Sequence, residues 1–176
     1  MKQIKVLAII VTFLFIGQQA EAQKIFGTRN GRITFESPTD GDVKAVNNEV
    51  TSRIADNGQL TFSLLMKGFK FKLAEMQEHF NDQYAESTKF PRADFKGTIA
   101  NLKEVNFSKD GSYKVSVKGD LTMHGVTKNV TVNGILEIKG GKPAARGSFV
   151  INLKDFKIDA SSVTEKVDVE VSCQYQ

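Results

Sequence analysis

Apolar and polar residues alternate at every second position along much of the C-terminal half of this sequence. The alternation covers residues 113–123, 126–138, 149–153 and 167–173. Successive side chains of a β-strand point to opposite faces, so this pattern predicts strands with one buried and one solvated face. Glycine-containing turn signals, such as Gly140-Gly141, separate the stretches. Strands of this kind are typical of an antiparallel sheet.

The N-terminal half repeats the pattern less regularly. Apolar residues mark strands at 33–35, 46–54, 60–66 and 93–99, which brings the expected total to about eight. An antiparallel sheet of that size can close on itself and so remove its exposed edges. A two-sheet sandwich produces the same alternation, and periodicity does not separate the two architectures.

Four glycines fall in phase with the apolar residues of their predicted strands. They are Gly97, Gly119, Gly134 and Gly147. A glycine on an inward face lets a strand bend and also removes side-chain volume. We therefore favour an all-β fold built as a closed antiparallel barrel. The glycines either supply the curvature of that barrel or hollow out a cavity within it.

Residues 67–91 interrupt the strand rhythm. Apolar side chains recur there at spacings of three and four, as on one face of a helix: Phe69, Leu73, Met76, Phe80 and Tyr84. Pro91 bars any further helix. Hairpin loops are normally much shorter, so we predict an amphipathic helical insertion between two strands. We interpret it as a lid over the open end of the barrel; packing on the outside of the sheet is the alternative.

The N-terminus has the pattern of an export signal. A basic start precedes an apolar run at 6–16, and Ala20-Glu21-Ala22 places small residues where a signal peptidase reads. A membrane span needs about 20 apolar residues, roughly twice the length of this run. We therefore predict a signal peptide at 1–22, cleaved before Gln23, and one exported domain at 23–176. No stable membrane insertion is expected.

Charge and cysteine content exclude several classes of function. The formal net charge is +4 and the basic residues are spread along the chain, whereas patches that bind nucleic acid are denser. Cys173 is the only cysteine, so no intramolecular disulfide forms. Its place on an apolar strand face predicts a buried, inert thiol, with pairing to a second chain as the alternative. The oligomeric state stays open, a dimer included.

Catalytic and metal-binding signatures are few. The sequence contains two histidines, His79 and His124, and lacks the His-x-x-x-His and Cys-x-x-Cys spacings of metal sites. Nucleophile, phosphate-loop and dinucleotide motifs are missing as well. Glu75 and His79 form an i,i+4 pair, which is more typical of an exposed ion pair on a helix than of a metal site. We expect a protein that is not an enzyme and has no metal or dedicated cofactor.

The aromatic content indicates what a hollow barrel would hold. The sequence has 13 phenylalanines and no tryptophan. The interior of a small barrel is either packed with side chains or holds one ligand. A lining of this composition suits a hydrocarbon chain better than a sugar or a nucleotide.

Two stretches resemble signatures of the YceI-like family. The first is Gly119-Asp120-Leu121-Thr122-Met123-His124-Gly125-Val126-Thr127-Lys128, a strand–turn–strand run. The second is Met76-Gln77-Glu78-His79-Phe80-Asn81, followed by Tyr84, Glu86-Ser87, Lys89-Phe90-Pro91, Ala93 and Phe95-Lys96-Gly97. The resemblance implies a lipocalin-like barrel of eight antiparallel strands in the bacterial periplasm. It also implies that a polyisoprenoid, an isoprenoid quinone or another long amphiphile binds within the barrel.

We therefore expect a periplasmic binding protein that sequesters or carries a long hydrophobic ligand, an isoprenoid or another lipid. The alternatives are an enzyme that acts on such a lipid, with His79 or His124 as acid–base, and a protein-interaction barrel with a packed interior. The residues predicted to contact the ligand are Phe62, Leu64, Phe69, Met76, Phe80, Tyr84, Phe95, Val117, Leu121, Met123, His124, Leu136, Phe149 and Ile151.

His124 has two interpretations. By the family resemblance it contacts a ligand head group at the barrel rim, together with Tyr84. Alternatively it stabilises the tight turn that it forms with Gly125, through hydrogen bonds to local backbone. We favour the structural role.

Overall fold

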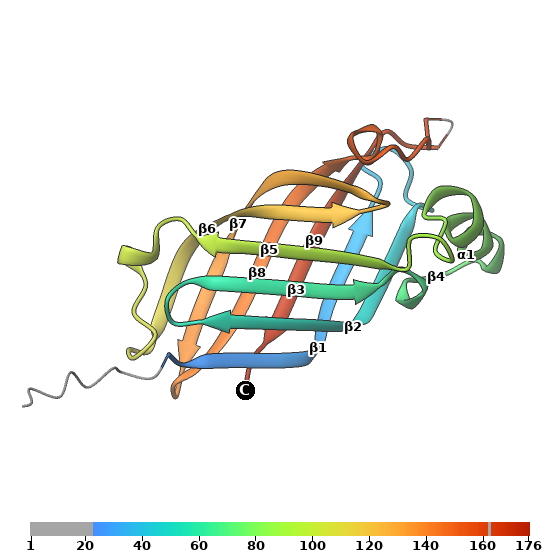
Figure 1. Ribbon diagram of the computed structural model, residues 1–176. Coiled ribbons are helices and arrows are strands. Elements are labelled where there is room, and N and C mark those ends of the chain that lie inside the picture. Colours follow the sequence, from blue (N-terminus) through green and yellow to red (C-terminus); the bar gives the residue numbers. More distant parts are fainter. Residues whose placement is uncertain (1–22, 162) are drawn as a thin grey trace, which may run out of the picture.

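The structure, a computed structural model, describes residues 23–161 and 163–176, and its main feature is a closed antiparallel β-barrel (Figure 1). The predicted signal peptide at 1–22 lies outside the described residues. Eight strands form the barrel. They are β1 (Ile25–Glu36), β2 (Lys44–Ala55), β3 (Gln59–Leu65), β5 (Arg92–Ile99), β6 (Gly111–Met123), β7 (Val126–Lys139), β8 (Lys142–Asn152) and β9 (Lys166–Gln174).

Closure of the barrel depends on β1, which pairs with two neighbours. The strand order is β1-β9-β8-β7-β6-β5-β3-β2, and β1 pairs with β2 as well. Ile33 of β1 lies opposite Asn47 of β2 and opposite Val171 of β9. Each of the eight strands thus has a partner on both sides, which confirms the closed barrel and excludes the two-sheet sandwich. A further strand of two residues, β4 (Lys70–Phe71), pairs with β2.

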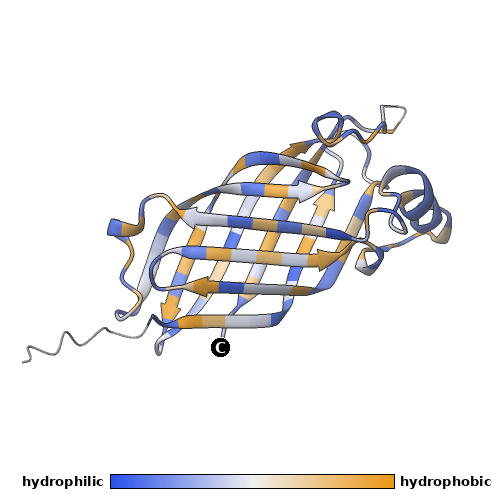
Figure 2. Ribbon diagram, in the orientation of Figure 1, coloured by the Kyte–Doolittle hydropathy of each residue, from blue (hydrophilic) through white to orange (hydrophobic). Residues whose placement is uncertain are grey.

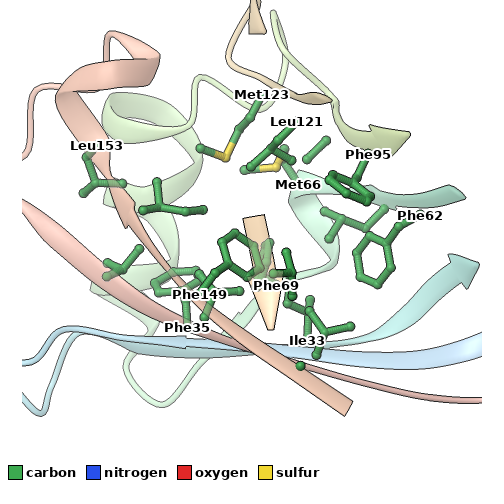
Figure 3. A pocket seen from close by; sticks show the side chains of 18 of the residues that line it. Ile33, Phe35, Phe62, Met66, Phe69, Phe95, Leu121, Met123, Phe149 and Leu153 are labelled. Carbon is green, nitrogen blue, oxygen red and sulfur yellow. The ribbon is translucent and has the colours of Figure 1, made fainter. Parts of the chain in front are cut away.

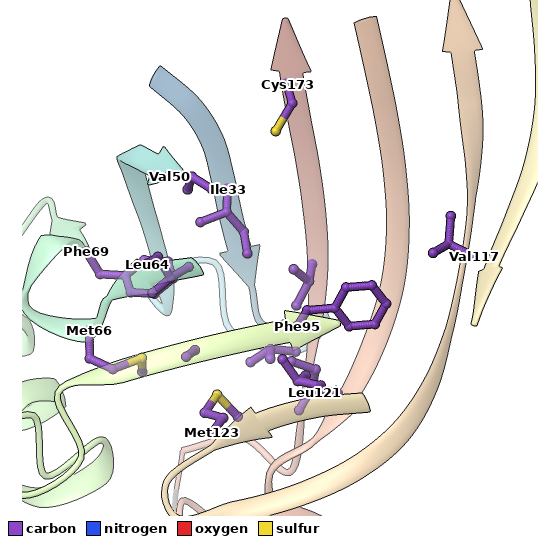
Figure 4. Close-up of a cluster of buried hydrophobic side chains, with 14 of the residues drawn as sticks. Ile33, Val50, Leu64, Met66, Phe69, Phe95, Val117, Leu121, Met123 and Cys173 are labelled. Carbon is purple, nitrogen blue, oxygen red and sulfur yellow. The ribbon is translucent and has the colours of Figure 1, made fainter. Parts of the chain in front are cut away.

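The alternation seen in the sequence separates the interior of the barrel from its surface. On β6, Val117 and Leu121 are buried, whereas Lys118 and Asp120 between them are exposed. Figure 2 shows the resulting alternation of apolar and polar residues along the strands. Inward side chains from all around the barrel therefore meet in one hydrophobic core, of which Figure 4 shows a part.

The register between β1 and β2 shifts twice, which changes what β2 presents to the interior. The shifts lie between Thr28 and Gly31 and between Gly31 and Ile33. As a result, Asn47 of β2 is 1% exposed although it is out of phase with the buried Val50 and Ile54. The period-two pattern did not predict this buried polar group, because a bulge offsets the alternation by one residue. Ser52, which is in phase with Val50 and Ile54, is also 1% exposed.

The helical insertion is shorter than predicted. The α-helix α1 (Ala74–His79) continues as one π-helical segment, η2 (Phe80–Tyr84). Phe69 and Leu73 were expected on the same helix, and this was wrong: residues 70–71 form β4 instead, and Leu73 has an extended backbone. Pairing with β2 holds this part of the chain in a strand. The helical turns end well before the proline, because Glu86 has a left-handed φ of 42°.

Four short segments of 3-10 or π type complete the described secondary structure. Three of them are single 3-10 turns that connect strands. They are η1 (Met66–Gly68), η3 (Leu102–Glu104) and η4 (Leu153–Phe156), in addition to η2.

The four in-phase glycines form two cross-strand pairs. Gly97 lies opposite Gly119 between β5 and β6, and Gly134 lies opposite Gly147 between β7 and β8. The ring of Phe95 covers the first pair, so that pair supplies close strand approach rather than empty space. The second pair lines the internal cavity. Close strand approach applies to the second pair as well, because an added Cβ on Gly134 would overlap the carbonyl oxygen of Arg146. The second pair thus combines the two predicted roles.

Replacement of Gly119 by alanine should destabilise the barrel. An added Cβ would overlap the carbonyl oxygen of Lys96 and the Cα of Gly97, both backbone atoms of the neighbouring strand. We expect Gly119→Ala to lower the free energy of unfolding in urea by about 1–3 kcal/mol, as for other overpacked sites. Gly41→Ala is the matched control, because nothing lies within 4 Å of a Cβ there. An equal effect of both substitutions would contradict the close-approach role.

Candidate functional site

The barrel encloses an apolar cavity of about 200 Å³. A cavity that holds a single water needs roughly 15 Å³ on the same measure, so this cavity is large enough for a much bigger guest molecule. The side chains around it come from strands on all sides of the barrel and from the helical insertion (Figure 3). The interior of the described barrel is therefore hollow rather than fully packed.

Most of the predicted ligand-contacting residues line this cavity. Twelve of the fourteen do so, and whether they contact a ligand stays a prediction. They are Phe62, Leu64, Phe69, Met76, Phe80, Tyr84, Phe95, Val117, Leu121, Met123, Phe149 and Ile151.

Leu136 and His124 lie outside the cavity lining. Leu136 is buried with no exposed surface and belongs to the hydrophobic core. Gly134, two residues earlier on the same face of β7, does line the cavity. The apolar periodicity correctly identified the inward face of β7, but it does not indicate which part of that face borders the cavity.

Four phenylalanine rings close the cavity where the helical insertion meets the barrel. The ring of Phe80 lies 5.7 Å from Phe35, 5.6 Å from Phe69 and 5.0 Å from Phe71, measured between ring centroids. Phe35 and Phe69 also meet edge to face at 5.1 Å. Such aromatic contacts stabilise beyond the apolar area that they bury. The insertion therefore covers an end of the barrel and does not pack on the outside of the sheet.

Two members of this cluster were not predicted. Phe71 lies within the predicted insertion at 67–91 but does not share its helical spacing of apolar residues, and in the structure it belongs to β4. The signal that identifies it is the local alternation of Phe69, Lys70 and Phe71, which is a strand pattern. Phe35 was expected in a strand, and the pattern did not place it at the covered end.

A small polar group interrupts the apolar lining just after the end of β9. The hydroxyl of Tyr175 lies 2.9 Å from Ser52 Oγ, and Ser52 in turn donates to the carbonyl oxygen of Thr61 at 2.8 Å. Burial raises the pKa of Tyr175 and raises that of the Cys173 thiol to about 11. Both groups are therefore uncharged at neutral pH. Cys173 is 2% exposed, which fits the predicted inert thiol.

His124 connects three segments of the chain at the rim of the barrel. It occupies the tight turn between β6 and β7 with a φ of 51°, followed by Gly125 with 71°. Its Nδ1 donates to the carbonyl oxygen of Phe156 at 3.0 Å, since a carbonyl can only accept. Its Nε2 lies 2.8 Å from Glu86 Oε2, within hydrogen-bonding distance. The ring also packs on Phe90 at 4.4 Å.

This geometry changes the interpretation of His124. The partners are distant in sequence, so the expected hydrogen bonds to local backbone are wrong. The side chain is 9% exposed and both nitrogens are engaged, which leaves no free ring nitrogen for a head group. The histidine thus joins the end of the insertion, through Glu86, to the β6–β7 turn and to η4. Glu86 was not singled out, because only its left-handed backbone brings it to the turn.

Sequence and structure comparisons agree on the family. The family model described as the YceI-like domain matches residues 19–175, which is most of the chain. The chain belongs to the YceI-like family.

Relatives and solved structures extend this result. Protein YceI of Shigella flexneri is 34% identical over 110 residues, which cover 57% of this chain and 53% of the relative. The chain thus spans about half the length of that curated relative. A UPF0312 protein of Pseudomonas fluorescens is 27% identical over 156 residues, covering 84% of this chain and 70% of the relative.

Two solved structures share the fold of this YceI-like barrel. A polyisoprenoid binding domain from Saccharophagus degradans, implicated in plant cell wall breakdown, superposes with a TM-score of 0.73 at 12% identity; the match covers 86% of this chain and 97% of that domain. Burkholderia cenocepacia BcnA gives a TM-score of 0.67 at 15% identity, covering 83% and 96%. At these identities the likeness shows the fold alone.

Neither a metal-ligand cluster nor a membrane-spanning helix occurs in the described part of the chain. Residues 23–161 and 163–176 contain no group of three His, Cys, Asp or Glu side chains that would hold a metal. Within the same residues, no helix is long and apolar enough to cross a membrane.

The contact between Glu86 and His124 predicts a pH-dependent stability of the YceI-like barrel. Hydrogen bonding to His124, and then to Lys89, lowers the pKa of Glu86 from its ordinary value of 4.5. The ionised carboxylate therefore stabilises the folded state above the ordinary pKa, and this stabilisation is lost as the pH falls through the lowered pKa. We expect Glu86→Gln to have a lower Tm than the parent protein at neutral pH. This gap between the two Tm values should narrow below pH 4.5.

Thermal unfolding followed by circular dichroism across this pH range measures the gap. Glu75→Gln is the control, because Glu75 lies exposed on α1 and forms no ion pair within the described residues. A gap for Glu86→Gln that stays constant down to the lowest pH would contradict the assignment.

Proposed function

We propose that this protein binds one long hydrophobic molecule, a polyisoprenoid, an isoprenoid quinone or a similar lipid, inside its barrel. The observation that carries the proposal is the covered apolar cavity, with twelve of the predicted contact residues around it. We further propose that the protein acts in the periplasm as a carrier or store, on the basis of the export signal predicted at 1–22. The polyisoprenoid-binding relative from Saccharophagus degradans supports the same class of ligand.

The free energy of such binding comes from apolar surface removed from water. Each CH₂ group that leaves water contributes about 0.8 kcal/mol. A hydrocarbon chain has no hydrogen bonds to lose, and the walls of the cavity offer almost none. The few polar side chains, such as Tyr175 and Thr164, are hydrogen-bonded to the protein itself. A long chain therefore gains on transfer to the cavity, whereas a sugar or a nucleotide would lose its hydrogen bonds to water.

The charge of the lining indicates an uncharged guest. Among the lining residues of the described chain, Arg146 is the one with an ionisable basic group, and its side chain is exposed. No Asp or Glu belongs to that lining. An ionised group would be desolvated in this cavity without a partner, which costs several kcal/mol. Any polar end of the ligand is therefore expected at an end of the barrel and not along its wall.

Native mass spectrometry of the protein purified from its natural host tests the proposal directly. We expect the barrel to retain a co-purifying hydrophobic molecule, seen as an added mass that organic extraction removes and identifies. A barrel that is consistently ligand-free, and that binds no isoprenoid on reconstitution, would contradict the proposal. That result would favour the protein-interaction barrel instead.

The aromatic cluster predicts how the covered end retains the ligand. Phe80→Asp places a carboxylate among three phenylalanine rings, where an unpaired charge costs several kcal/mol, so the ligand should dissociate at least about tenfold faster. Leu73→Asp is the matched control, since Leu73 belongs to the same insertion but is 50% exposed and does not line the cavity. The dissociation rate of a fluorescent isoprenoid measures both. Unchanged retention in Phe80→Asp would show that the cluster is not a barrier to exit.

A further inference from the structure

One continuous segment at the covered end has two different faces. We call residues Leu65–Leu73 the strap; it contains η1 and β4. Met66, Phe69 and Phe71 point inward and line the cavity. The remaining side chains, apart from Gly68, are exposed: Leu65, Lys67, Lys70, Lys72 and Leu73. The strap is therefore both a wall of the cavity and a part of the outer surface.

The outer face of the strap combines positive charge with exposed leucines. Its three lysines form no ion pair with any carboxylate in the described residues. The strap itself contains no acidic residue; Glu75 and Glu78 begin only on the following helix. Leu65 and Leu73 are 51% and 50% exposed, among the most exposed large apolar side chains described. These leucines lie at the two ends of the strap, with the lysines between them.

The position of the strap distinguishes it from the rest of the surface. It lies beside β2 and leads into α1, at the end of the barrel that the insertion covers (Figure 1). Phe69 and Phe71, on its inner face, belong to the aromatic cluster around Phe80. The segment that carries the lysines therefore also carries part of the aromatic cluster that closes the cavity.

We propose that the outer face of the strap docks on an anionic lipid surface. Lysines near such a surface are attracted to its phosphate head groups, while leucines beside them enter the interface between head groups and acyl chains. The exposed side chains of the strap are lysines and leucines, without the aromatic residues in which the cores of protein interfaces are enriched. The proposal deepens the proposed function and rests on it for its purpose: a lipid carrier must exchange its ligand with a bilayer. Docking places the covered end of the cavity against that bilayer.

The arrangement couples docking to the cavity through neighbouring residues. Lys70 and Lys72 alternate with Phe71 along the chain, so their attachment to head groups acts on the same backbone that holds the aromatic cluster. The same alternation fixes the direction of the two faces, because successive side chains of a strand point to opposite sides.

Co-sedimentation of the purified protein with lipid vesicles tests the proposal. The probes are vesicles of phosphatidylglycerol and phosphatidylcholine, compared with vesicles of phosphatidylcholine alone, neither containing an isoprenoid. We expect binding to the anionic vesicles that weakens with added salt. The variant K67Q/K70Q/K72Q should bind about a hundredfold more weakly, since each basic residue contributes about fivefold.

A second triple variant separates the strap from total charge. K114Q/K118Q/K139Q removes the same charge from exposed lysines on β6 and β7, two of them near the opposite end of those strands. It should lose much less affinity than the strap variant. Equal losses of affinity in both variants would overturn the proposal. It would also be overturned if the parent protein did not bind anionic vesicles, and a protein partner would then be the remaining occupant of this face.

Ligand retention, measured in parallel by native mass spectrometry, keeps the two proposals distinguishable. A strap variant that still holds its ligand but fails to bind vesicles supports docking as a separate step. If the parent protein holds its ligand but does not bind anionic vesicles, the docking proposal alone is overturned. A protein that binds vesicles through the strap but never holds a lipid overturns the proposed function alone.

Discussion

Closure of the sheet is the constraint on which the rest of this structure depends. Because β1 pairs with both β2 and β9, the backbone of all eight strands is hydrogen-bonded on both sides, and the inward side chains share one interior. The width of that interior is set by the number of strands. Side chains fill it near Leu136, and the glycine pair of β7 and β8 leaves it open. The cavity is thus a product of the closed backbone and of a few small residues.

The period-two alternation was enough to predict the strands and their buried faces, because burial on one side of a sheet imposes that pattern directly. The buried Asn47 could not be predicted, since a register shift depends on how β1 and β2 meet. The helix was predicted too long for a related reason. Phe69 and Leu73 fit a helical spacing, but the pairing of β4 with β2 holds the chain between them in a strand. Tertiary contacts thus overrode local periodicity at both places.

The candidate site shows the same contrast between what a local pattern predicts and what depends on tertiary contacts. Residues on a regular inward face, such as Val117 and Leu121, were identified from sequence because their orientation follows from the strand alone. The contact between His124 and Glu86 joins residues that are 38 positions apart and depends on left-handed backbone at both. Nothing in the local pattern specifies such a contact. The resemblance to the YceI-like family included both residues without indicating that they touch.

The role of β9 in closing the barrel has a consequence for the order of folding. Most neighbouring strands are also neighbours in sequence and pair as the chain grows, but β1 must wait for the last strand. The backbones of Gly27 and Gln176 exchange two hydrogen bonds, so the closing contact involves the final residue. Until then both β1 and β8 present open edges, which are sites of mispairing between chains. Loss of even a few C-terminal residues would therefore act on assembly of the barrel before it acted on any ligand.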